Sequence, residues 1–179
     1  MPARYHPAQV VLHWLSAVLV ISAWTIGALV FKRIPDTEAA LKILALGVHM
    51  TTGLTIALVV ALRLALRFTL ASPPRATSGN ALLDRLAPVV HAALYVAALA
   101  MAASGLALAV QAGLPAIVFG DADRPLPANL HKLAAREVHE VIGTILISLV
   151  ALHAAAACYH QFVRRDRLLA RMWFRTGTP

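Results

Sequence analysis

Six of the eight histidines in this 179-residue chain lie in or at the edges of long apolar segments, at depths that match in pairs. They are His13, His49, His91, His139, His153 and His160. An ionisable side chain inside a membrane is costly, so such a residue marks a candidate functional site. Two imidazoles that face each other at one depth can bind one haem iron from both sides. The histidines therefore predict a membrane electron carrier with two haem sites.

The composition of the chain is that of a membrane protein. Hydrophobic residues make up 60% of the sequence and charged residues only 13%, against roughly 25% charged residues in soluble domains. The formal net charge of +8 is compatible with nucleic-acid binding, but the basic residues stand in short loops and a tail beside apolar segments. That placement is expected from membrane topology and anionic headgroups. We therefore expect membrane lipid, and no nucleic acid, as a partner.

Cysteine usage limits the kind of haem. The single cysteine, Cys158, excludes an internal disulfide, and the sequence has no C-x-x-C-H motif for covalent haem attachment. Any haem in this protein would therefore be held without covalent bonds, as haem b.

Four apolar segments are long enough to cross the hydrocarbon core, which takes about 20 residues of helix. They cover residues 10–31, 43–67, 86–110 and 138–163, and the apolar part of the second ends at Leu62. Polar stretches connect them, such as the turn-rich S-P-P-R-A-T-S-G-N between the second and third. The predicted fold class is an all-α membrane protein, a four-transmembrane-helix bundle enclosing two b-type haems. Residues 1–179 are expected to form one domain, with the first helix retained.

Positive charge predicts the orientation of the bundle. The N-terminus, the second loop region and the C-terminal tail hold ten of the 16 Lys and Arg residues, with Arg63 and Arg67 counted among them. The first and third loops hold the other six and most of the acidic residues. We therefore expect a multi-pass membrane protein with both termini in the cytoplasm.

Depth can be counted along each helix at about 1.5 Å per residue. His49 and His139 then lie in an outer layer, near the periplasmic face, and His13, His91 and His153 lie in an inner layer. His139 and His153 are 14 residues apart, which is about 21 Å and two heptads, so they share one helix face. One helix can thus carry a ligand for each of two stacked haems.

The inner layer offers three histidines for two axial positions. His153 shares its face with His139, which makes it the anchor, but depth alone leaves His13 and His91 equal as its partner. The one that is not a ligand is a candidate contact for a haem propionate. Small residues four positions after a histidine, Gly53 and Gly143, are expected to leave room for the macrocycle.

Several motifs in the chain resemble those of a known family. They are His13 followed by Trp14, the H-x-x-x-G that begins at His49, the segment around His91, and the H-E-x(12)-H-A-A-A-A that begins at His139. Together they are similar to the bacterial cytochrome b561 family over essentially the whole chain. The likeness is greatest to its small four-helix di-haem members that oxidise superoxide.

The resemblance implies a specific set of ligands and substrates. It implies that His13 pairs with His153 and that His49 pairs with His139 around two haems b. It also implies a ubiquinone site near the inner haem, where His160 matches a family histidine and His91 and Arg164 are second candidates. Superoxide would be oxidised at the periplasmic face. A basic patch there would concentrate this anion; the candidates are Lys42, Lys132 and Arg136, with Arg33 and Arg124 also considered.

A second function fits the same pattern. Related di-haem four-helix proteins act as relay or anchor subunits that pass electrons between a partner dehydrogenase or hydrogenase and quinone. The short outer loops, which contain no evident docking domain, favour the stand-alone oxidoreductase. A haem-free transporter or scaffold is a third interpretation, and six membrane histidines disfavour it.

Overall fold

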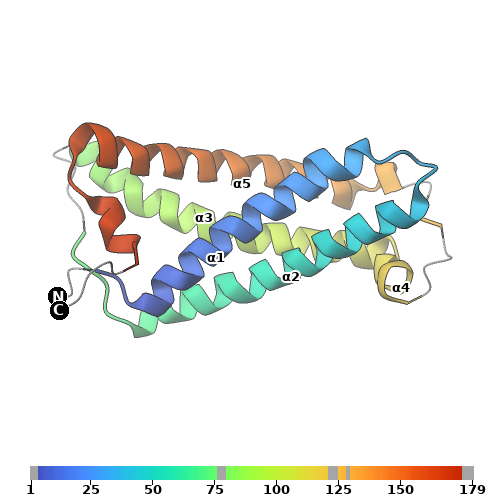
Figure 1. Ribbon diagram of the computed structural model, residues 1–179, viewed down its shortest axis with the longest axis horizontal. Helices are drawn as coiled ribbons and strands as arrows, with labels where there is room; N and C mark the ends of the chain where they lie inside the picture. The colour runs from blue at the N-terminus through green and yellow to red at the C-terminus, as the bar shows by residue number, and fades with distance from the viewer. Residues whose placement is uncertain (1–3, 76–79, 121–124, 128–129, 175–179) are drawn as a thin grey trace.

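The computed structural model describes residues 4–75, 80–120, 125–127 and 130–174. Within these ranges four long helices run the length of the molecule (Figure 1). They are α1 (Pro7–Trp24), continued by a π segment (Thr25–Val30) and a 3₁₀ turn (Phe31–Arg33), α2 (Ala39–Thr69), α3 (Ala81–Gln111), and α5 (Ala134–Cys158), continued by a second π segment (Tyr159–Arg164). The shorter elements are α4 (Leu114–Phe119) and the 3₁₀ turns Leu130–Lys132 and Leu168–Met172.

The predicted four-span, all-helical fold is confirmed, because each of the four helices is long and apolar enough to cross a membrane. Each begins about one turn before its predicted start, and polar side chains cap two of them, α1 and α3. His6 accepts a hydrogen bond from the Ala8 amide through Nδ1 (3.2 Å), and Gln9 accepts one from the His6 amide (3.3 Å), which forms a reciprocal cap for α1. Asn80 caps α3 by accepting from the amides of Leu82 and Leu83.

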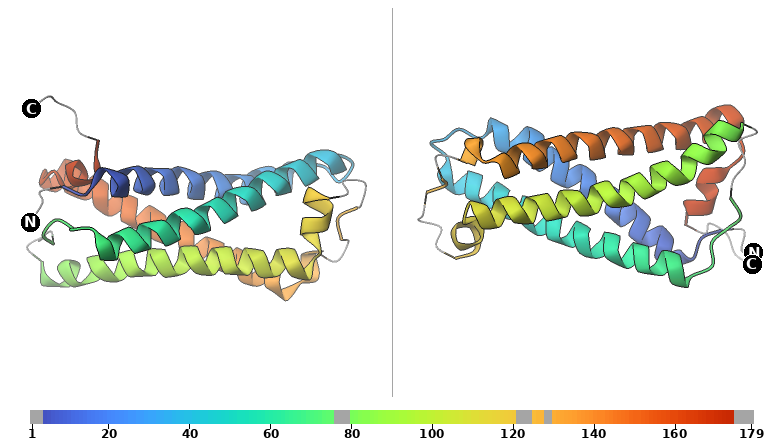
Figure 2. Two further views of the ribbon diagram at one scale, coloured as in Figure 1. Left: turned by 90° about the horizontal axis from the view of Figure 1, so that it is seen from below. Right: turned by 180° about the vertical axis from the view of Figure 1, so that it is seen from behind.

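The helices pack as two pairs, α1 with α2 and α3 with α5, and α2 also packs against α3. In Figure 1, α1 crosses the bundle obliquely. Figure 2 shows the same four-helix arrangement from below and from behind, with α4 turned across the bundle at one end. We call this the α4 end and the opposite one, where α1 begins, the α1 end.

Side chains near mid-bundle form an apolar core that is distinct from the outer surface. Its buried residues are Ala23, Ile56, Val60, Ala97, Ala98 and Leu146. Large apolar side chains cover much of the outside; Leu58, for example, is 71% exposed and Phe68 is 81% exposed. An apolar exterior of this extent suits lipid tails and would be a liability in water.

Candidate functional site

His49 and His139 face each other near the α4 end. His49 is on α2 and His139 on α5, and their ring centroids are 6.1 Å apart. His49 Nδ1 lies 3.0 Å from the carbonyl oxygen of Ala23, two residues before the first π segment. A carbonyl only accepts, so Nδ1 carries the ring proton and the Nε2 lone pair is free to bind a metal.

His139 is fixed in the same way by a serine. Its Nδ1 lies 3.0 Å from Ser104 Oγ, and the Ser104 hydroxyl donates to the carbonyl of Met101 (2.9 Å). Because the hydroxyl proton is already used, Ser104 accepts from Nδ1, and Nε2 of His139 is also left free. Both rings of this pair thus present the same nitrogen as a ligand.

A second group of imidazoles lies toward the α1 end. The ring centroids of His13 on α1 and His153 on α5 are 6.1 Å apart, and those of His91 on α3 and His153 are 5.3 Å apart. The structure therefore brings His13 and His91, the other two histidines of the predicted inner layer, close to His153. Leu146 of the apolar core lies halfway along α5 between His139 and His153, so this core separates the two groups.

The centroid distances test whether an iron fits between the rings. An imidazole nitrogen binds a first-row metal at about 2.0 Å and its ring centroid lies about 1.1 Å further out, so two opposed ligands have centroids roughly 6 Å apart. The His49–His139 and His13–His153 distances of 6.1 Å match that value, whereas the His91–His153 distance of 5.3 Å is too short. This spacing favours His13 over His91 as the partner of His153.

Two glycines leave the space that the outer-layer imidazoles occupy. A Cβ added to Gly27 in the first π segment would lie 2.8 Å from Cε1 of His49, and one added to Gly105 on α3 would lie 3.0 Å from Cε1 of His139. The glycines singled out from the sequence do not contact the histidines, since a Cβ at Gly53 would meet no atom within 4 Å and one at Gly143 would meet Met101. Sequence spacing missed Gly27 and Gly105 because each lies on a helix that faces the histidine rather than on its own helix.

Arg63 corrects the placement of charge inferred from the sequence, which counted it with the loop cations. It lies inside α2, and its side chain turns into the bundle. There Nη2 is 2.9 Å from Nδ1 of His13, Nη1 donates to Ser16 Oγ, and the guanidinium carbon lies 5.6 Å from the centroid of the Tyr95 ring. A cation inside a span is a functional hypothesis in its own right.

His160 lies in the second π segment and pairs with an acid beyond it. Its Nδ1 is 2.6 Å from Oδ2 of Asp166, and Arg164 Nε lies 3.6 Å from the same oxygen. Asp166 is flanked by Arg165 and Arg167, which both have left-handed backbone angles (φ 56° and 57°). Such angles are costly for residues other than glycine, and they turn the chain sharply around the acid.

The charge of Asp166 is stabilised by its surroundings. Burial alone would raise the pKa of Asp166, but the hydrogen bonds from His160 and the Leu168 amide, together with the charges of His160 and Arg164, hold that pKa below its ordinary value. A lowered carboxyl pKa means that Asp166 stays ionised at neutral pH and is neutralised only when the pH falls well into the acid range.

The cations predicted to attract an anion stand at the α4 end, and two of them have acidic partners. Lys42 makes an ion pair with Asp36 and lies over the Phe31 ring, and Arg136 pairs with Glu140 (3.0 Å). Lys132 and Arg33 are exposed. Arg124, the remaining candidate, lies outside the described residues.

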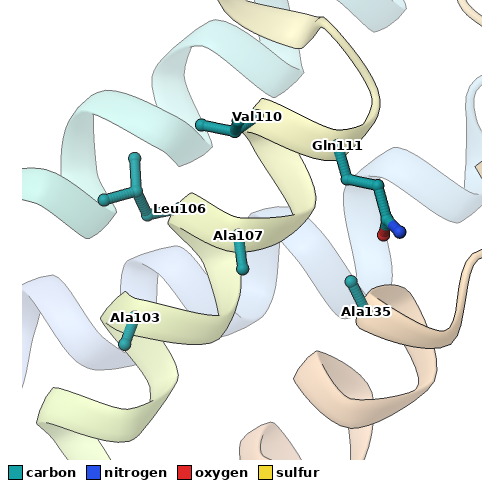
Figure 3. Close-up of a pocket in the computed structure, with 6 residues that line it drawn as sticks. All are labelled: Ala103, Leu106, Ala107, Val110, Gln111 and Ala135. Atoms are coloured by element: carbon teal, nitrogen blue, oxygen red, sulfur yellow. The ribbon is translucent and has the colours of Figure 1, made fainter.

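One hollow of the molecule does not involve the histidines. It has a volume of about 650 Å³ and lies on the surface between the end of α3 and the start of α5. Figure 3 shows its lining of Ala103, Leu106, Ala107, Val110, Gln111 and Ala135. With five apolar side chains and one amide, it offers lipid contact and no redox chemistry.

Four helices long enough to cross a membrane, with imidazoles paired at two levels, define an integral membrane cytochrome b. Comparison of the sequence with known families gives the particular group. The chain belongs to the prokaryotic cytochrome b561 family, whose model matches residues 4–175. It is accordingly an electron-transfer protein with haem b as its cofactor.

Similar proteins match over nearly their whole length. The chain is 26% identical to cytochrome b561 homolog 1 of Escherichia coli K12 over 171 residues, which covers 94% of this chain and 96% of that protein. It is 26% identical to the probable superoxide oxidase CybB of Yersinia pestis over 179 residues, or 96% and 97% of the two chains. It is 28% identical to cytochrome b562 of Cereibacter sphaeroides over 170 residues, or 94% of each.

Proposed function

We propose that this protein oxidises superoxide at the periplasmic face of the bacterial inner membrane and delivers the electrons to ubiquinone at the cytoplasmic face. Two superoxide anions each lose one electron and leave as dioxygen, and one ubiquinone takes up the two electrons and two protons. The observation that carries this proposal is the presence of two imidazole pairs, each with centroids 6.1 Å apart, on opposite sides of the apolar core.

In this proposal His49 and His139 hold an outer haem b, and His13 and His153 hold an inner one. The bound haems supply one-electron exchange between ferric and ferrous iron. The excess of Lys and Arg at the α1 end supports a cytoplasmic position for that end. The similarity to a protein named a probable superoxide oxidase supports superoxide as the electron donor.

At the periplasmic face the protein has to attract a small anion. Lys42 and Arg136 are each paired with a carboxylate, so their net attraction is reduced, whereas Lys132 is exposed. We assign the patch to these three cations and expect Lys132, which has no carboxylate partner among the described residues, to contribute most of its attraction, since a positive charge near a site raises the arrival rate of anions.

At the cytoplasmic face the protein has to supply protons to ubiquinone. Because Asp166 accepts from Nδ1 of His160, it directs Nε2 of that ring away from itself, toward a quinone carbonyl. With Nδ1 held by the carboxylate, Nε2 is the ring nitrogen that can exchange a proton with ubiquinone. His91 and Arg164 are the second candidates for contact with ubiquinone.

The proposal is tested with the purified protein loaded with haem. Addition of superoxide is expected to reduce the haems rapidly, as followed by their visible absorption, and addition of a soluble ubiquinone is expected to reoxidise them. Lys132→Gln is expected to slow the first phase by about three-fold at low ionic strength and less at high salt, with the second phase unchanged. If superoxide leaves the haems oxidised and a co-purified dehydrogenase or hydrogenase reduces them, the relay function replaces this one.

Replacement of Asp166 tests the role of the His160 pair. Asp166→Asn removes the charged acceptor that orients the His160 ring, so reoxidation of the haems by ubiquinone is expected to slow by about ten-fold, within the range of general acid–base effects. Reduction by superoxide and haem content should stay the same. The matched control is Glu137→Gln, which makes the same charge change in the first turn of α5 at the other face. Equal reoxidation rates in Asp166→Asn and the control would exclude this role.

A further inference from the structure

We propose that Arg63 sets the reduction potential of the inner haem above that of the outer haem and thereby directs electrons from the periplasmic to the cytoplasmic face. This inference rests on the two-haem assignment made above. It concerns a residue that contacts neither face of the membrane and that the proposed reaction does not itself require.

The charge of Arg63 is held inside the membrane-spanning helix α2. Its contacts are His13 Nδ1, Ser16 Oγ and the Tyr95 ring, and all three partners are uncharged. Ser16 is itself buried, at 4% exposure. These contacts satisfy the guanidinium N–H groups without cancelling the positive charge, and in a medium of low dielectric constant such a charge acts over several ångströms.

The outer pair of imidazoles differs from the inner pair in its hydrogen-bond partners. His49 and His139 donate to the carbonyl of Ala23 and to the hydroxyl of Ser104, which are neutral acceptors. Along α5, Arg136 and Glu140 are paired with each other, and Glu137 is exposed. An acceptor on Nδ1 makes the imidazole more electron-rich and so stabilises ferric iron.

The charge of Arg63 affects the two oxidation states of a haem differently. Ferrous haem carries one positive charge fewer than ferric haem, so a fixed cation nearby stabilises the ferrous state and raises the potential. Arg63 is such a cation beside His13, and Arg67, one helical turn further along α2, adds a charge of the same sign at greater distance from it. The two sites therefore differ in the sense needed for electrons to move from His139 toward His153.

The position of the ring proton on His13 shows that the charge of Arg63 stays near the inner haem once haem is bound. In the structure Nδ1 of His13 accepts from Arg63, which requires the proton on Nε2. With Nε2 committed to iron, Nδ1 would carry the ring proton and would no longer accept from Arg63. Arg63 would keep Ser16 and Tyr95 as neighbours, so its charge would remain beside the inner site.

The experiment is a potentiometric titration of the loaded protein followed by visible spectra. To assign each potential, the titration is repeated in a His139→Ala background, which retains only the inner haem. Arg63→Gln is expected to disfavour reduction of the inner haem by about ten-fold, which is a potential lower by about 59 mV for one electron, with the outer haem unmoved. Arg63→Lys, which keeps the charge, should restore most of the difference, and Arg67→Gln should shift the inner haem less.

A second variant guards against loss of the inner haem in Arg63→Gln. Ser16→Asp leaves Arg63 in place and neutralises its charge from the adjacent position, so it should lower the same potential by a similar amount. An inner potential that does not move in either loaded variant, or two potentials that fall equally, would overturn the inference. Failure of the proposed function is seen separately, because it would show in the unmodified protein as a missing haem or as no response to superoxide.

Discussion

Replacement of His139 by alanine is expected to lower the haem content of the purified protein from about two per chain to about one. His139 supplies one side of the outer site opposite His49, and alanine has no ligand atom to replace its imidazole. Since His153 lies two heptads further along α5 and belongs to the other pair, the inner haem should remain. The measurement is a pyridine haemochrome assay together with the spectrum of the reduced protein.

The matched control is His91→Ala. His91 is the third imidazole near His153, but its 5.3 Å centroid distance is too short for an intervening iron. This variant should therefore keep both haems, whereas His13→Ala should lose the inner one. The opposite outcome, in which His91→Ala empties the inner site and His13→Ala does not, would reassign the ligand.

The four spans were predictable from sequence because lipid imposes one strong rule. Every backbone polar group inside the bilayer must be satisfied, so a long apolar segment has to be helical. The ends of the helices were harder to predict by the same reasoning. Hydropathy marks where the apolar stretch stops, near Leu62, but α2 continues to Thr69 because its backbone remains hydrogen-bonded through the polar residues that follow.

The depth of each histidine along its helix was also predictable. The direction in which a side chain points within the bundle was not. The rise of about 1.5 Å per residue places His13 and His91 at one level, and only packing distinguishes their distances to His153. Arg63 shows the same limit. A cation just past an apolar stretch counts as a loop charge in any linear scan, and its inward direction depends on Ser16 and Tyr95 on two other helices.

The π segments were not expected from the sequence either. One includes Gly27 and the other includes His160, so each lies beside a group to which we assign a role. Such segments are frequent at functional sites. No residue pattern along α1 or α5 distinguishes them from the α-helix that precedes them, because the change in hydrogen bonding follows from the packing of the whole bundle.

The second large effect is expected from adding a single methyl group to Gly27. By helix propensity alone, Gly→Ala stabilises a helix by about 1 kcal/mol. At Gly27, however, the new Cβ would lie 2.8 Å from Cε1 of His49, closer than real Cβ contacts allow. His49 cannot retreat freely, because its Nδ1 is held by the Ala23 carbonyl and its Nε2 faces His139. Overpacking of this kind costs about 1–3 kcal/mol.

This overpacking should weaken the binding of the outer haem. Since 1.4 kcal/mol is a factor of ten in binding, Gly27→Ala is expected to weaken retention of the outer haem by about ten-fold, and Gly27→Val should abolish it. Gly47→Ala provides the control, because it makes the same chemical change on α2, where the new Cβ would lie 3.1 Å from Cγ1 of Val118 and would meet no histidine. Haem content and thermal unfolding are measured on all three variants. Full outer-haem occupancy in Gly27→Val would show that His49 does not need the position it occupies in order to bind iron, and the pairing with His139 would have to be abandoned.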